Sequence, residues 1–220
     1  MVELVACDIA GTTLDDHGLV YDALENAVAA TGTAVTREDV ARWMGADKRE
    51  AVLALLGGAA GDDEVRVVHE DFCSRLRDSY DERPPVPFDG VPELLADLRA
   101  RGVRVALTTG FDRAITGPLL ESVGWDEGVV DAVVCADEVA AGRPAPYLVH
   151  RAMERCGVQR VDRVVVVGDT VLDLRAGSNA GALAVVGVLT GGVATQTLGA
   201  ERHTHLLDSL AGLRSVLDAL

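Results

Sequence analysis

The chain has 220 residues, a formal net charge of −15 and a hydrophobic content of 49%, which suits one α/β domain, or a domain with a sizeable insertion, around a buried core. No apolar run reaches the ~18 residues that a membrane span needs, and the acidic balance argues against nucleic acid or an anionic membrane as a partner. The first residues lead straight into a strand pattern and the four cysteines show no paired spacing, so we expect reduced thiols and a cytoplasmic location.

Short apolar runs alternate with helical patterns along the chain, which predicts an α/β fold on a Rossmann-like parallel sheet. The continuous Val, Leu and Ala character of these runs indicates central strands buried on both faces. We expect strands at about residues 3–7, 103–108, 132–135, 163–167, 182–188 and 205–207, and core helices at about 92–101, 113–123, 146–156, 173–180 and 210–220.

The first predicted strand is followed by helical patterns alone, at about residues 20–31, 37–44, 49–56 and 62–80. A stretch of that length is a helical insertion rather than a loop. We therefore predict a small cap domain at residues 18–83, inserted into a core domain made of residues 1–17 and 84–220. No strand is expected between Asp15 and residue 103, and the prolines of residues 83–87 predict a stiff return linker.

Polar side chains follow the first two predicted strands, where ligands bind in open α/β sheets. Asp8 leaves the first strand and precedes a Gly-Thr-Thr turn, which aims backbone N–H groups back at the carboxylate. An ordinary aspartate turn fits these residues equally well. Thr109 and Gly110 follow the second strand and precede a helix, an arrangement that can seat an anion, although a simple helix cap explains this motif better when it is taken alone.

Two further motifs stand beside later strands. Pro144 and Pro146 hold the backbone rigid around Arg143, which suits charge stabilisation at a fixed point, and an exposed arginine in a proline-rich turn explains the segment about as well. Asp169 and Asp173 lie four residues apart at a strand–helix junction and can face one point. Such hard oxygen ligands suit Mg²⁺; a plain turn and helix cap is the weaker interpretation, because two buried like charges repel each other without a cation.

The four motifs supply an acid, a hydroxyl, an arginine and a pair of acids, in this order and each beside a strand end. This pattern resembles that of the haloacid dehalogenase superfamily of hydrolases over the whole core. The resemblance implies that Asp8 is the nucleophile that forms an aspartyl-phosphate. It also implies that Thr109, Gly110 and Arg143 bind the phosphoryl group. A carboxylate attacks a phosphoryl group only when cations cancel the repulsion between them.

The same resemblance implies Mg²⁺ as the cofactor. Asp8, the carbonyl of Ala10 and Asp169 would hold the ion, and Asp173 would order its waters. Ordinary phosphatases and mutases of the superfamily carry a second aspartate two residues after the nucleophile, where it protonates the leaving alcohol. This chain has Ala10 there, so cleavage of an ordinary ester loses an acid typically worth ~10²–10⁴-fold.

The phosphonoacetaldehyde hydrolase branch of the superfamily is known for alanine at that place, and the cap of this chain resembles it too. Met44, Gly45 and Lys48 match its Met-Gly-x-x-Lys motif, whose residues contact the substrate and whose lysine forms a Schiff base with the substrate aldehyde. Lys48 is the only lysine of the chain, although a single lysine among many arginines also arises by chance. Because Lys48 lies in the cap and Asp8 in the core, the site is expected to be complete only when the two close together.

Three positions depart from that branch: Ala51 replaces a histidine, Gly18 a cysteine and Phe111 a tyrosine. A phosphatase of small phosphate esters and a non-catalytic phosphate-binding regulator therefore stay open beside a C–P hydrolase. The five histidines fall in none of the motifs and are interpreted as structural. The expected partner is a small phosphonate or phosphate, without nucleic acid or membrane, and the resemblance leaves a homodimer open.

Overall fold

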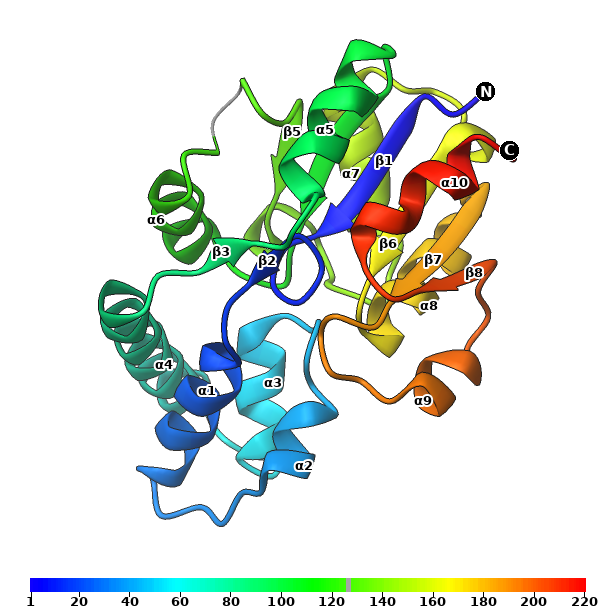
Figure 1. Ribbon diagram of the computed structural model, residues 1–220. Helices are drawn as coiled ribbons and strands as arrows, with labels where there is room; N and C mark the ends of the chain where they lie inside the picture. Colours follow the sequence, from blue (N-terminus) through cyan, green and yellow to red (C-terminus); the bar gives the residue numbers. More distant parts are fainter. Residues whose placement is uncertain (126–127) are drawn as a thin grey trace.

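The computed structural model describes residues 1–125 and 128–220. Its centre is a parallel six-stranded sheet in the order β5-β4-β1-β6-β7-β8 (Figure 1). The predicted α/β fold with a Rossmann-like parallel sheet is confirmed. The strands are β1 (Leu4–Asp8), β4 (Arg104–Thr108), β5 (Ala132–Val134), β6 (Val164–Gly168), β7 (Ala184–Val188) and β8 (His205–Leu207).

Both faces of the sheet are covered, which explains why the strands are continuously apolar. Val5 and Cys7 of β1 pack in one cluster with residues of α5, α6 and α10, whereas Leu4 and Ala6 pack in a second cluster with α7. Successive side chains of a strand point to opposite faces, so every residue of β1 is buried. The core helices are α5 (Val91–Ala100), α6 (Arg113–Ser122), α7 (Tyr147–Cys156), α8 (Val171–Ala180), α9 (Thr195–Gly199) and α10 (Leu213–Leu217), with 3-10 turns at Ala136–Glu138, Val161–Arg163 and Leu210–Gly212.

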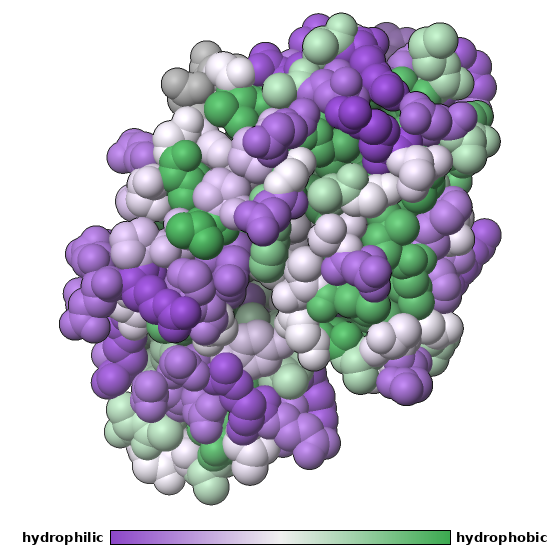
Figure 2. All heavy atoms as spheres, in the orientation of Figure 1, coloured by the Kyte–Doolittle hydropathy of each residue, from purple (hydrophilic) through white to green (hydrophobic). Residues whose placement is uncertain are grey.

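Helices α1 (Leu19–Ala29), α2 (Arg37–Ala41), α3 (Lys48–Leu55) and α4 (Asp62–Glu82), which we call the cap, lie together at one end of the sheet (Figure 1). Leu24 of α1 and Phe72 and Leu76 of α4 are completely buried, and α1 and α4 contact each other along much of their lengths. The exact domain boundaries at residues 17/18 and 83/84 stay a prediction. In Figure 2 the surface of the cap is mostly hydrophilic.

The expectation of no strand between Asp15 and residue 103 was wrong. Two-residue strands β2 (Leu14–Asp15) and β3 (Val86–Pro87) pair antiparallel and connect the core to the cap on both sides of the insertion (Figure 1). Strands this short show no alternation of apolar and polar residues, so the sequence pattern could not reveal them. Helix α9 was also missed, and the predicted final helix is a 3-10 turn followed by α10.

The four cysteines form no disulfide: Cys7 and Cys135 are buried, and Cys73 and Cys156 are half-buried. Within the described residues, no helix is both long and apolar enough to cross a membrane.

Candidate active site

Asp8 ends β1 between two strands, and the predicted Thr109 and Asp169 directly follow these two strands. Strand β1 pairs with β4 on one side and β6 on the other, so the residues after all three strands meet at one edge of the sheet. The turn after Asp8 is tight, because the carbonyl of Ile9 accepts hydrogen bonds from the N–H groups of residues 12, 13 and 14. Gly11 has φ +86°, and a Cβ there would lie 2.6 Å from a carboxylate oxygen of Asp169. Glycine is therefore needed at position 11 for its backbone and for space.

Three buried carboxylates, those of Asp8, Asp169 and Asp173, form a cluster whose oxygens lie within 4.8 Å of one another. The hydroxyl of Thr12 donates to Asp169 Oδ1 at 2.7 Å. The backbone N–H and hydroxyl of Thr170 donate to Asp173 Oδ2 at 3.0 and 2.5 Å, as part of the capping box that begins α8. These bonds fix the two acids that follow β6.

Arg143 is the cation at the centre of this cluster. Its Nη1 lies 2.7 Å from Asp8 Oδ1 and its Nε lies 2.9 Å from Asp173 Oδ1. Its Nη2 donates to the carbonyl and the hydroxyl of Thr108, both at 2.9 Å. The side chain is buried, so the exposed-arginine interpretation of the proline-rich segment was wrong. The guanidinium spans two carboxylates and is oriented by the end of β4.

The charges in this cluster do not balance. Burial, only partly opposed by the Arg143 charge, raises the pKa of Asp8 to about 7. Burial and then the neighbouring carboxylates of Asp8 and Asp173 raise the pKa of Asp169 well above its ordinary value. One guanidinium thus faces three buried acids, and a cation bound between them would restore ionisation.

A small divalent cation fits this set of donors. All three side chains offer carboxylate oxygens, the hard ligands that Mg²⁺ takes in proteins, and an excess negative charge is left for the ion to neutralise. Ala10, predicted to offer its carbonyl, lines the same cavity. Asp173 does not line that cavity and lies against Arg143 instead.

The loop after β4 meets the cap directly. The hydroxyl of Thr109 accepts the N–H of Phe111 at 3.1 Å. A Cβ at Gly110 would lie 2.2 Å from the carbonyl oxygen of Ala46, so only glycine permits this approach of core and cap backbones. Arg143 Nη1 also reaches the carbonyl of Gly45 at 3.3 Å. The cap is therefore closed on the core in this structure.

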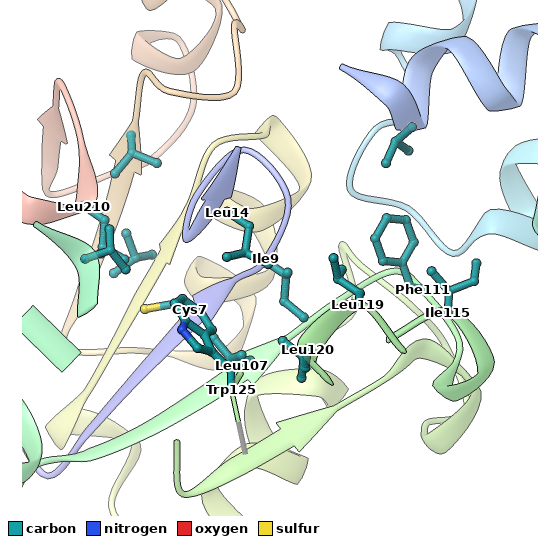
Figure 3. Close-up of a cluster of buried hydrophobic side chains, with 14 of the residues drawn as sticks. Cys7, Ile9, Leu14, Leu107, Phe111, Ile115, Leu119, Leu120, Trp125 and Leu210 are labelled. Carbon is teal, nitrogen blue, oxygen red and sulfur yellow. The ribbon is translucent and has the colours of Figure 1, made fainter. Parts of the chain in front are cut away.

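Lys48 is the first residue of α3, and its side chain points into the site rather than to solvent. Asp47 caps the helix by accepting the N–H groups of residues 49 and 50. Only 3% of Lys48 is exposed; its Nζ donates to the carbonyl of Ala46 at 3.1 Å and lies 5.4 Å from the centre of the Phe111 ring. In Figure 3, Phe111 stands at the end of the buried cluster that faces the cap.

The environment of Lys48 favours the neutral amine. Burial, reinforced by the Arg143 charge and opposed by Asp8, lowers its pKa to about 8. At pH 7 about one amine in ten is then neutral, against about one in a few thousand for an ordinary lysine. A buried, partly neutral amine is the form that adds to a carbonyl group.

One cavity of about 110 Å³ brings most of the predicted residues together. It is lined by the predicted Asp8, Ala10, Met44, Gly45, Lys48, Thr109, Gly110, Arg143 and Asp169. Asp16, Tyr21 and Gly191 also line it, and the sequence patterns gave no signal for them. Gly191 is required because a Cβ there would lie 1.7 Å from Asp169 Oδ2. Burial raises the pKa of Asp16 above its ordinary value, as it does for Asp8 and Asp169 of the same cavity.

Known proteins resemble this chain over nearly its whole length. Residues 2–181 match the haloacid dehalogenase-like hydrolases. Phosphonoacetaldehyde hydrolase of Bacillus cereus strain B4264 is 30% identical over 95% of this chain and 83% of its own length. Two solved structures superpose closely: a hydrolase from Pseudomonas syringae (TM-score 0.89, 20% identity, 100% of this chain and 99% of that one) and a phosphonoacetaldehyde hydrolase-like protein from Oleispira antarctica (TM-score 0.88, 21% identity, 99% and 92%). At these identities the two structures support the fold alone.

Proposed function

Because the chain belongs to the haloacid dehalogenase-like hydrolase family, we propose that it cleaves the C–P bond of a small phosphonate aldehyde of the phosphonoacetaldehyde type. The observation that carries this proposal is Lys48: the only lysine of the chain is buried in the same cavity as Asp8. Position 10 holds alanine, which cannot protonate a leaving alcohol. An amine that forms an imine makes such an acid unnecessary.

In the proposed reaction the neutral amine of Lys48 adds to the aldehyde, and the adduct takes up one proton and loses water to give a protonated imine. Asp8 attacks phosphorus from the core side. The C–P electron pair moves into the iminium as the bond breaks, so carbon departs as an enamine and needs no proton from an acid. The enamine takes a proton from water at the carbon that carried phosphorus and becomes an iminium again. Water then hydrolyses the aspartyl-phosphate and the iminium, which frees the amine of Lys48. The products are inorganic phosphate and an aldehyde one phosphoryl group smaller.

The surrounding side chains have distinct tasks in this scheme. Arg143 neutralises the charge of the phosphoryl oxygens, and Arg143 and Thr109 orient these oxygens. Met44 and Gly45 line the part of the cavity beside Lys48 that receives the aldehyde group. Mg²⁺, held by Asp8, the carbonyl of Ala10 and Asp169, would supply charge neutralisation for attack by one anion on another. Asp173 fixes Arg143 from behind at 2.9 Å.

The size of the cavity limits the substrate. Its volume of about 110 Å³ is well below the roughly 300–1,000 Å³ of sites for drug-sized ligands. Among phosphonates, an aldehyde with two carbons is of the right class. The direct test is incubation with phosphonoacetaldehyde and Mg²⁺, with acetaldehyde and phosphate measured together. Equal amounts of the two products are expected, and phosphate release only from esters would reject C–P cleavage.

A phosphatase acting on small esters is the second candidate, and Asp16 is what favours it. That carboxyl lines the same cavity and burial raises its pKa, so it could serve as the acid that position 10 lacks. In that case Asp16→Asn should abolish ester hydrolysis, whereas C–P cleavage through Lys48 should survive the substitution.

Removing divalent metal should abolish activity. Asp8, Asp169 and Asp173 carry more negative charge than Arg143 balances, and the nucleophile is one of the three. We expect no turnover in excess EDTA, full recovery with Mg²⁺, and poor recovery with Ca²⁺, which prefers longer bonds and more ligands. Circular dichroism in EDTA should show an unchanged fold. Full activity in chelator would contradict the metal-dependent scheme.

The pH dependence of imine formation should report the lowered pKa of Lys48. Its amine is nucleophilic only when neutral, so trapping of an aldehyde by borohydride should speed up as pH rises and level off above about 8. An ordinary lysine would keep accelerating to about pH 10.4. Initial trapping rates from pH 6 to 10 measure this, with a short lysine peptide as the control. A trapping rate that still increases above pH 9.5 would show that burial does not lower the pKa of this amine.

A further inference from the structure

A second group of potential ligands lies across the boundary between cap and core. His69 and Cys73 stand four residues apart on α4 and therefore on one face of that helix, with Cys73 Sγ 3.7 Å from His69 Nδ1. Asp112, the residue that caps α6 of the core, places its Oδ2 3.7 Å from His69 Nε2. One ligand atom from each residue lies within 4.8 Å of the other two.

These donors differ in kind from those of the candidate active site. An imidazole, a thiol and a carboxylate together suit Zn²⁺, whereas Mg²⁺ takes oxygen alone. Zinc bonds of ~2.0–2.3 Å in tetrahedral geometry keep neighbouring ligand atoms roughly 3.3–3.8 Å apart. A metal ion binds one ring nitrogen, and His69 Nε2 lies 3.8 Å from Cys73 Sγ and 3.7 Å from Asp112 Oδ2. Both separations suit zinc, and the third pair, Cys73 and Asp112, lies within 4.8 Å, so the two side chains need only move closer together.

His69 and Asp112 each present a ligand atom to a metal, whereas burial raises the pKa of the Cys73 thiol to about 11, so the thiolate forms only when a metal binds it. His69 is 4% exposed, and burial holds its pKa below the ordinary value, which keeps a lone pair free at neutral pH. Asp112 uses Oδ1 to accept the N–H of Ile115, and Oδ2 is the atom turned to His69. A cavity lined by His69 and Asp112 leaves room for water as the fourth ligand.

We propose that His69, Cys73 and Asp112 form a Zn²⁺ site that ties helix α4 of the cap to the core. On binding, the Cys73 thiol loses its proton to solvent and the thiolate, the imidazole and one carboxylate oxygen hold the ion. The site is independent of the Asp8 cluster, since none of its ligands belongs to that cluster.

The position of the site gives it a consequence for turnover, and only this consequence rests on the proposed function. Asp112 follows Gly110 and Phe111, the loop that packs on the cap beside Lys48. The cavity between cap and core has a volume of only about 110 Å³, so we expect substrate and products to pass when cap and core part. A metal bonded to both sides opposes that parting, so Zn²⁺ should slow turnover under saturating Mg²⁺.

The test uses Co²⁺ as a spectroscopic substitute for Zn²⁺, added to the whole protein in excess Mg²⁺ so that the carboxylate cluster is occupied. We expect a thiolate-to-cobalt absorption band that one equivalent of Zn²⁺ removes. Cys73→Ser should abolish the band, and Asp112→Asn, which retains the helix cap, should weaken Zn²⁺ binding by more than about 10-fold, since loss of even an outer partner costs ~10–100-fold. Cys156→Ser, at the other half-buried cysteine, should keep both the cobalt band and the affinity for Zn²⁺.

Hydrogen exchange provides a second measurement that does not depend on activity. Zn²⁺ should protect α4 and the loop before α6 in the unaltered protein and in Cys156→Ser, but not in Cys73→Ser. A protein without the band, or a band that survives in Cys73→Ser, would overturn the proposal. If the band appears and phosphonoacetaldehyde is not cleaved, the zinc site stands and only the proposed function fails.

Discussion

Asp8→Asn is expected to abolish turnover, with a fall of about 10⁴–10⁶-fold, the range seen when a covalent nucleophile is removed. Asparagine keeps the shape of the side chain but cannot form an acyl-phosphate. The fold should persist, because burial already disfavours the charge of Asp8, as its pKa of about 7 indicates. Arg143 also keeps its second partner, Asp173.

Phosphate release at saturating Mg²⁺ and the melting temperature are the two measurements. Asp218→Asn is the matched control, since it makes the same chemical change at an exposed carboxylate that pairs with Arg101 on the surface. That variant should keep full activity. Phosphate released by Asp8→Asn at a rate within about 100-fold of the unaltered protein's would remove Asp8 from the role of nucleophile.

Lys48→Arg should have an effect of similar size on C–P cleavage while leaving the Asp8 cluster intact. Arginine keeps the positive charge but forms no imine, so the electrons of the C–P bond have nowhere to go. Lys48→Met is the second variant, because methionine is close to lysine in length and carries no charge. It shows whether a loss of activity in Lys48→Arg comes only from a guanidinium that is too large for the cavity. Both variants should lose acetaldehyde formation by about 10⁴-fold or more.

Covalent trapping gives the same prediction a direct readout. Phosphonoacetaldehyde and borohydride should leave one adduct per chain, and peptide mass should place it on Lys48. Arg66→Lys adds a lysine at an exposed position of α4 and serves as the control: the adduct should still map to Lys48 and not to position 66. No adduct, together with undiminished hydrolysis by Lys48→Arg, would leave Lys48 as a substrate contact and favour the phosphatase.

The sequence by itself determined the architecture and grouped most of the candidate site residues. Continuous apolar strands alternating with helices specify a parallel sheet, because only strands buried on both faces lack alternation. In such a sheet the residues after neighbouring strands must meet, so Asp8, Thr109 and Asp169 could be grouped before any coordinates were known. The role proposed for Lys48 rests on family resemblance and on its being the only lysine, not on periodicity.

Only the tertiary structure decided which distant side chains touch. The bond from Thr12 to Asp169 spans 157 residues, and neither residue signals the other locally. The contacts of Arg143 with Asp8 and Asp173 likewise depend on how loops from separate strands converge.

The structure likewise decided what meets across the boundary between cap and core. His69 fell in no sequence motif, yet α4 packs it against Asp112 of the core. The β2–β3 pair, two residues on each strand, is too short to leave a pattern. Local propensity fixes the elements, whereas contacts between them depend on packing that no short window of sequence contains.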